Sequence, residues 1–139
     1  MSPAGGGLFV EHLAESECWD LLSSGRVGRI GVLVDSAPEI YPMNYAVSDR
    51  AVFFRTDEGS KLRGLERSPS VCFEVDEMQA DLRTGWSVLL KGRASELVDP
   101  ADVDRARALE LELWSVGAKS HWFRIDPREV TGRRIDRGG

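Results

Sequence analysis

The stretch Phe53-Phe54-Arg55-Thr56-Asp57-Glu58-Gly59-Ser60-Lys61 predicts a strand, a tight acidic turn and the start of a helix. The first backbone N–H groups of a helix have no acceptor within the helix, and together with the helix dipole they favour an anion. Arg55 adds a planar fork of donors, Lys61 adds a point charge, and the stretch also carries two hydroxyls. These groups suit a phosphate. The alternative interpretation is a solvated surface on which the two acidic residues of the turn neutralise the two cations.

Short strands with tight connections dominate the rest of the chain. β-Branched runs, alternating apolar residues and turn residues at short intervals support this interpretation. The expected helices are 17–23, 59–67 and 99–116, and the expected strands are 26–34, 39–47, 51–56, 70–76, 85–98 (one bent strand or a pair), 121–125 and 129–135. The pattern predicts a mainly β protein with short helices, in which six or seven antiparallel strands form a small closed barrel.

Several residues mark the ends and irregularities of these elements. Ser16 is expected to cap the first helix, and Asp99-Pro100 is a strong start for the last one. Gly92 is expected at a β-bulge in the long strand. Residues 1–10 are expected to be flexible and residues 136–139 to form a polar tail, so a single domain would span residues 11–135.

Composition narrows the class of protein. The 139 residues are 42% hydrophobic and carry a net charge of −5, which fits a soluble domain and argues against nucleic-acid binding. No apolar run is long enough for a membrane span, and residues 1–7 do not look like a secretory signal. Cys18 and Cys72 are expected to be reduced thiols of a cytoplasmic protein. His12 and His121 are isolated, so no metal site is expected.

Three further stretches carry flat or polar side chains. Tyr41-Pro42-Met43-Asn44-Tyr45 is a kinked strand whose edge could bind the rim of a planar heterocycle, although a bulged strand with Tyr45 in the core is the simpler interpretation. Trp86-Ser87-Val88 follows Gly85 and could face a ligand, fill a barrel end or contact another subunit. An exposed Trp122, near the basic stretch 131–134, could wall an aromatic anion or pack at the rim.

The motifs that are absent also guide the interpretation. The chain has no GxGxxG opening a βαβ unit and no GxxxxGK[ST], which disfavours a dinucleotide Rossmann site and a triphosphatase site. The two histidines suggest no Ser-His-acid or Cys-His pairing. A phosphate pocket with aromatic neighbours but no acid–base machinery suggests a cofactor that carries its own chemistry.

The joint order of these motifs resembles the pyridoxamine 5′-phosphate oxidase-like family. The resemblance spans about residues 15–135. It rests on Gly28-Arg29-Ile30, Pro42-Met43-Asn44-Tyr45, Phe54-Arg55-Thr56, Gly59-Ser60-Lys61, Phe73-Glu74-Val75-Asp76, Gly85-Trp86-Ser87-Val88, Gly92-Arg93-Ala94 and Thr131-Gly132-Arg133-Arg134.

The resemblance implies a split β-barrel homodimer that binds FMN at the subunit interface and acts on a small-molecule substrate. Residues carried over by motif to the FMN phosphate are Arg55, Thr56, Ser60 and Lys61. Those carried over to the isoalloxazine ring are Pro42, Met43, Asn44 and Tyr45, with Trp86, Ser87 and Val88 on the strand that faces the cofactor or the partner, and Trp122 from the second subunit.

The C-terminal part of the chain departs from the pattern of true pyridoxamine 5′-phosphate oxidases. They carry an Arg-x-His element that contributes to substrate binding, whereas this chain reads Gly132-Arg133-Arg134-Ile135. The resemblance therefore implies an FMN-dependent oxidoreductase without implying that substrate. Two alternatives remain: a deazaflavin-dependent reductase of the same fold, with Arg63, Arg67, Arg133 and Arg134 steering an anionic tail, or a non-enzymatic flavin-binding or storage protein.

Overall fold

Eight strands form one antiparallel sheet in the computed structural model, which describes residues 8–109 and 121–137. The strand order is β3-β2-β6-β7-β8-β5-β4, and β1 also pairs with β8. The strands are β1 (Leu8–His12), β2 (Val27–Val34), β3 (Ala37–Asn44), β4 (Ala46–Ser48), β5 (Ala51–Thr56), β6 (Ser70–Gln79), β7 (Thr84–Glu96) and β8 (His121–Arg137). The helices are α1 (Glu15–Ser24), α2 (Ser60–Arg67) and α3 (Pro100–Arg107).

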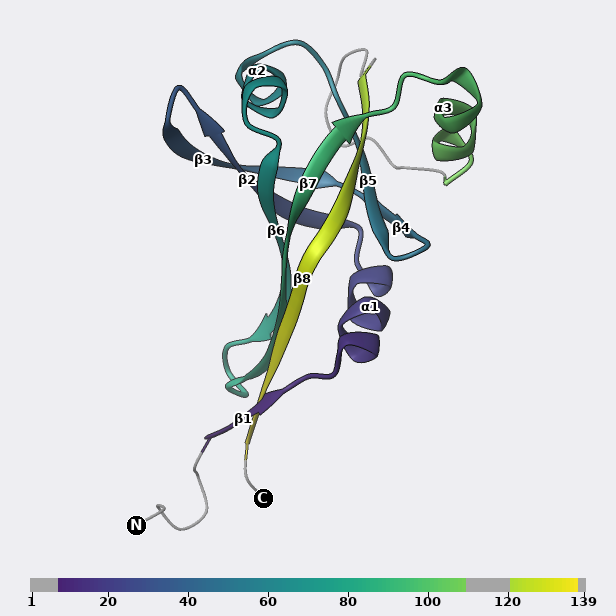
Figure 1. Ribbon diagram of the computed structural model, residues 1–139. Coiled ribbons are helices and arrows are strands. Elements are labelled where there is room, and N and C mark those ends of the chain that lie inside the picture. The colour runs from purple at the N-terminus through teal and green to yellow at the C-terminus, as the bar shows by residue number, and fades with distance from the viewer. Residues whose placement is uncertain (1–7, 110–120, 138–139) are drawn as a thin grey trace.

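The two longest strands, β7 and β8, form the axis of the molecule (Figure 1). The end of β8 and β1 lie at one end of this axis, and α2 and α3 lie at the other (Figure 1). The sheet curls into a split barrel, as expected. Among the described residues no ladder joins the outer strands β3 and β4, so the expectation of a closed barrel was wrong.

Alternation along the strands gives the sheet a core face and an outer face. In β6, Val71, Phe73 and Val75 are buried while the residues between them are not. Two aromatic pairs organise the core: Phe54 stacks on Phe123 at 5.4 Å between ring centroids, and Tyr45 meets Phe73 edge-on at 4.9 Å. The helices α1 and α2 close the core with Cys18, Trp19, Leu22, Leu62 and Leu65.

Two-residue loops set the register of the first hairpins. Asp35 and Ser36 connect β2 to β3, and both have positive φ, of 50° and 67°. Asp49 and Arg50 connect β4 to β5 with φ of 49° and 54°. Loops of this kind match the twist of the flanking strands, which explains why such short connections are tolerated.

The second predicted strand is two strands in the structure, because Tyr45 breaks it. β3 ends at Asn44 and β4 begins at Ala46. The Tyr45 N–H donates to the Arg26 carbonyl at 3.1 Å, and its hydroxyl donates to the Leu22 carbonyl at 2.5 Å. The interpretation of Tyr45 as a core residue is confirmed, with 3% of the residue exposed.

The last two predicted strands are one continuous strand, β8, which passes through Pro127. Pro127 pairs with Gly92, directly beside the predicted bulge, which the structure confirms as a register shift between Lys91 and Gly92. The bulge lets β8 continue past a residue that cannot donate a backbone hydrogen bond. The hairpin before it is also longer than expected, since β6 reaches Gln79 and β7 begins at Thr84.

The sheet extends beyond both ends of the predicted domain, 11–135. Leu8 to Val10 belong to β1, and Asp136 and Arg137 belong to β8, with Leu8 opposite Arg137 in the ladder. Leu8 to Val10 are apolar without alternation, and Asp136 and Arg137 are polar, so their pairing with each other makes them strands. Residues 1–7 and 138–139 lie outside the described residues.

Two predicted helix boundaries were wrong, and one was confirmed. α1 begins at Glu15 after Ala14, and the Ala14 N–H donates to the Glu17 carboxylate at 3.3 Å, so Ser16 is not the cap. Asp99 does cap α3, accepting from the Ala101 N–H at 2.9 Å. α3 ends at Arg107 rather than near 116, and residues 110–116 lie outside the described residues. No helix in the described ranges is long and apolar enough to cross a membrane.

Candidate functional site

The predicted anion stretch forms a turn between β5 and α2. β5 ends at Thr56 and α2 begins at Ser60, so residues 57–59 make the connection. Gly59 has a φ of 149°, which side chains rarely adopt, and a Cβ there would meet nothing within 4 Å. No side chain caps the start of α2. The start of α2 therefore has no side-chain cap and has open space beside Gly59, which is compatible with an anion site.

Arg55 is the best-placed cation of this turn. Its guanidinium carbon lies 5.1 Å from the centroid of the Trp122 ring, in a cation–π contact. Its Nε is buried and has no hydrogen-bond partner. A buried donor without an acceptor is costly, so this geometry fits an acceptor that is supplied by a bound anion.

The other three predicted phosphate residues lie on the same turn. The Lys61 Nζ lies 5.8 Å from the ring centroid of Tyr41 and 6.0 Å from that of Phe54, so it extends between β3 and β5. The Ser60 hydroxyl accepts from Arg63 at 3.1 Å. Thr56 is almost fully buried. Arg55, Thr56, Ser60 and Lys61 are thus together, and their contact with a phosphate remains a prediction.

The acidic residue Glu58 of this turn pairs with His121, which is isolated from other candidate residues in the sequence. His121 Nε2 lies 3.1 Å from Glu58, and its Nδ1 lies 2.7 Å from Glu96. These two hydrogen bonds raise the pKa of His121. His121 lies opposite Thr56 in the β5–β8 ladder, and only the strand register reveals that placement.

The predicted ring-binding residues of β3 divide between the two faces. Met43 is buried in the core with Tyr45, whereas Pro42 is exposed and Asn44 is partly exposed. Burial raises the pKa of Tyr45 to about 12, consistent with its structural role. Trp122 was expected to be exposed, but it is buried, with 3% of the residue exposed. The Arg55 guanidinium lies over its ring.

The predicted residues of β7 also divide between the faces. Val88 is fully buried and Trp86 lies on the same core face, while Ser87 lies on the outer face. Ser87 lines an outer-face hollow of about 300 Å³. The residues lining this outer-face hollow are His12, Ser87, Leu89, Thr131, Gly132 and Arg133. His12, Leu89 and Thr131 were not predicted as site residues, because only β1 and the strand register bring them beside Ser87.

Within one chain, the anion turn and the outer-face hollow lie far apart. Arg55 is opposite Trp122 on β8, and Ser87 is opposite Arg133, eleven residues further along the same strand. At about 3.3 Å per residue, that is roughly 35 Å. The structure therefore does not bring Arg55 and Ser87 of the same chain to a single flat ligand.

The fold is a split barrel, with the predicted anion turn between β5 and α2. The chain belongs to the pyridoxamine 5′-phosphate oxidase family, whose family model matches residues 14–134. The uncharacterized protein Rv0080 of Mycobacterium tuberculosis is 36% identical over 131 residues, which cover 91% of this chain and 86% of that protein.

Two solved structures are also similar to this chain. An FAD binding protein from Mycobacterium smegmatis is 40% identical with a TM-score of 0.76, and the match covers 91% of this chain and 98% of that one. An FAD-binding protein from Mesorhizobium loti is 30% identical with a TM-score of 0.80, and the match covers 94% of this chain and 99% of that one.

Proposed function

We propose that this protein is a homodimeric flavin-binding oxidoreductase, and that the turn from Arg55 to Lys61 holds the flavin phosphate. The observation that carries the proposal is the buried Arg55 Nε without a partner, beside the uncapped start of α2. The description of two similar structures as FAD-binding proteins supports a flavin here. When bound, a flavin would supply hydride or electron transfer, and this chain would bind and orient it.

We propose FMN as the flavin, held by a single phosphate. FAD contains the same riboflavin phosphate, so the anion turn fits both, and extraction of the bound cofactor distinguishes them. Three of the four arginines proposed to steer a deazaflavin tail have other partners, so they give that alternative no support. Arg63 donates to Ser60, Arg67 pairs with Asp35 at 3.2 Å, and Arg134 pairs with acidic residues at the opposite end of β8.

The separation along β8 supports a dimer in which both chains complete each site. Arg55 and Ser87 can contact one flavin only if they come from different chains, because roughly 35 Å of strand separates them within one chain. Exposed apolar side chains on the strands would also gain from burial in such an interface. They are Phe9, Val10, Val27, Leu33, Ile40 and Met78.

This arrangement assigns roles to the chain's own residues. Arg55, Lys61 and the α2 N–H groups bind the phosphate, and Pro42 and Asn44 are available at the edge of β3. The partner's Ser87 and the partner's Arg133 would line the outer-face hollow at the ring end, where a small-molecule substrate would enter. Trp86 and Val88 face the core and cannot face the same flat ligand as Ser87.

The decisive experiment measures flavin binding by the purified protein. The wild-type protein should show flavin absorption, or bind added FMN at micromolar concentration. Arg55→Ala and Lys61→Ala should each weaken binding roughly 10- to 150-fold, because a charge-assisted hydrogen bond contributes about 1.5–3 kcal/mol. Arg67→Ala is the matched control, since it removes the same charge from the exposed pair with Asp35.

Two outcomes would contradict the proposal. A wild-type protein that binds neither FMN nor FAD would exclude a flavin. Unchanged affinity in both Arg55→Ala and Lys61→Ala would place the phosphate elsewhere. Steady turnover of the bound flavin with a nicotinamide donor and an acceptor would distinguish an oxidoreductase from a storage protein.

A further inference from the structure

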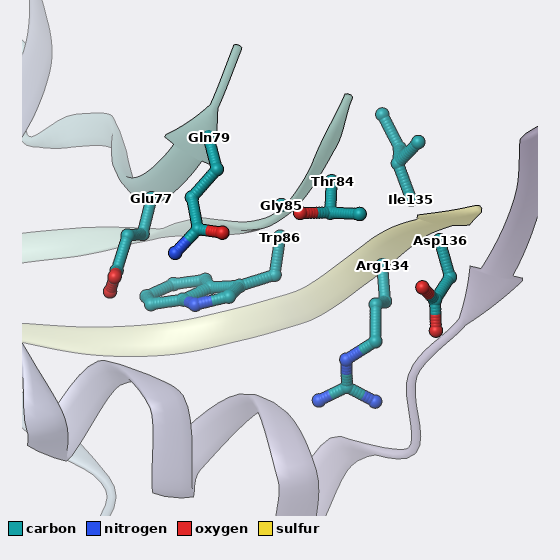
Figure 2. A pocket seen from close by; sticks show the side chains of 8 residues that line it. All are labelled: Glu77, Gln79, Thr84, Gly85, Trp86, Arg134, Ile135 and Asp136. Carbon is teal, nitrogen blue, oxygen red and sulfur yellow. The ribbon is translucent and has the colours of Figure 1, made fainter. Parts of the chain in front are cut away.

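A second hollow lies on the core face of β7 and β8, at the end of the sheet near α1. Its volume is about 200 Å³. The residues that line it are Glu77, Gln79, Thr84, Gly85, Trp86, Arg134, Ile135 and Asp136 (Figure 2). Strand alternation places Trp86 and Arg134 on the opposite face from Ser87 and Arg133. This core-face hollow is therefore distinct from the outer-face hollow proposed for the flavin.

Trp86 provides an aromatic surface in this core-face hollow. It packs against the edge of the core but is only partly buried. Figure 2 shows Glu77 and Gln79 near the outer end of the indole, with Arg134 and Asp136 beyond its attachment to the strand. The π-face of an indole attracts cations, and more strongly where water is partly excluded.

The charges around the core-face hollow favour a cation. Arg134 is its one lining cation, and it pairs with Glu11 at 3.8 Å and with Glu17 at 3.7 Å. Two further carboxylates, Glu77 and Asp136, line the hollow itself. Asp136 has an interaction of its own and is left out of the balance, but Glu11, Glu17 and Glu77 still outnumber the one lining arginine, so the local potential is negative.

We propose that the core-face hollow binds a small organic cation whose charged group lies on the Trp86 indole beside Glu77. Gln79 supplies an amide oxygen that accepts hydrogen bonds from an ammonium or guanidinium group. The volume fits one ring or one amine head group with a short apolar body. Arg134 stays with Glu11 and Glu17 and takes no direct part in binding.

The test uses benzyltrimethylammonium as the probe, with neutral benzyl alcohol and anionic benzoate for comparison. The readout is the indole N–H signal of Trp86 in a two-dimensional NMR spectrum, assigned by its loss in Trp86→Leu. Benzyltrimethylammonium should shift this signal saturably and bind at least about fivefold more tightly than benzyl alcohol. Glu77→Gln should weaken binding up to about fivefold, since an exposed charge pair contributes this much at most.

Two variants serve as controls. Glu129→Gln removes an exposed carboxylate of β8 outside the hollow and should leave probe binding unchanged. Arg134→Gln should leave binding unchanged or tighten it. Glu77 is exposed, so Glu77→Gln is informative even if Trp86→Leu fails to fold.

Three results would overturn the proposal: equal binding of the cation and benzyl alcohol, unchanged binding in Glu77→Gln, or binding of benzoate alone with its loss in Arg134→Gln. Flavin affinity, measured on the same samples, should not change in Glu77→Gln. The cation site does not depend on the flavin, so a protein that fails to bind flavin can still bind the probe.

Discussion

Tyr45 is a structural residue at the junction of β3 and β4. Its hydroxyl reaches the Leu22 carbonyl in α1, and its ring meets Phe73 in the core. The motif that carries the family resemblance therefore includes a residue that joins the sheet to a helix. A family motif can persist for packing as well as for ligand binding.

Tyr45→Phe is expected to destabilise the fold by about 1 kcal/mol without weakening flavin binding. The change removes one buried hydrogen bond but keeps the ring, and the Leu22 carbonyl still accepts from the Gly25 N–H at 3.3 Å. Urea unfolding and a flavin titration measure the two effects. A loss of flavin affinity at unchanged stability would show that the hydroxyl contacts the cofactor.

Glu74 is a residue whose environment raises the pKa of its carboxyl group. It shares a strand face with Asp76, and Arg29 lies 3.0 Å from Glu74 and 3.5 Å from Asp76. Burial, followed by the hydrogen bond with Asp76, raises the pKa of Glu74 from 4.5 to about 7, while Arg29 opposes this shift. The folded protein therefore holds a proton on this pair at a pH where the unfolded chain has lost it.

This raised pKa predicts that stability falls as pH rises from about 4.5 to about 7. The folded state binds more protons than the unfolded state in that window, so raising the pH favours unfolding. Glu74→Gln should flatten this part of the profile, because the amide cannot ionise. Melting temperature measured against pH checks it, with Glu129→Gln as the exposed control. The same slope in Glu74→Gln as in the wild-type protein would assign the proton elsewhere.

Among the elements, the bulge in β7 is what allows β8 to run unbroken. Gly92 lies opposite Pro127, and a Cβ at Gly92 would collide with the backbone carbonyl of Asp126. The backbones approach closely here because the bulge tightens the bend of both strands. Because β8 is long, the two hollows lie toward one end of the sheet and the anion turn lies at the other.

Gly92→Ala is expected to destabilise the protein by about 1–3 kcal/mol, because the methyl group has backbone rather than a flexible side chain to displace. Urea unfolding measures the loss. Ser95→Ala, an exposed position of the same strand, should change stability far less. Equal stabilities for the two variants would mean that the bulge relaxes freely.

At the scale of the whole molecule, the proposed site requires two chains. If the anion turn of one chain and the outer-face hollow of its partner share one flavin, then defects in the two parts can complement each other. A chain with Arg55→Ala lacks the anchor, and a chain with Ser87→Phe fills the hollow. Neither variant alone should bind flavin tightly.

Mixing these two variants in equal amounts under conditions of subunit exchange should restore roughly a quarter of the wild-type flavin sites. Random pairing makes about half of the dimers mixed, and each mixed dimer has one intact site out of two. Light scattering must first show that both variants remain dimers. No restored binding by exchanging dimers would mean that each site is built from one chain.

Local sequence patterns were sufficient for the class of fold and for the turn between β5 and α2. Strand alternation, the Asp99 cap, the bulge at Gly92 and the start of α2 depend on near neighbours in the chain, and all are present in the structure. The joint order of the motifs resembles the pyridoxamine 5′-phosphate oxidase family, to which the chain belongs.

The tertiary structure alone decided which distant residues meet. The pairing of β1 with β8, the burial of Trp122 beneath Arg55 and the contact of His121 with Glu58 all depend on strand register. Register is set by long-range packing, and a shift of one residue moves every side chain to the other face of the sheet. For that reason the sequence determined which residues are chemically suited to an anion. The fold decided that Ser87 lies far from that anion turn, on the opposite face from Trp86.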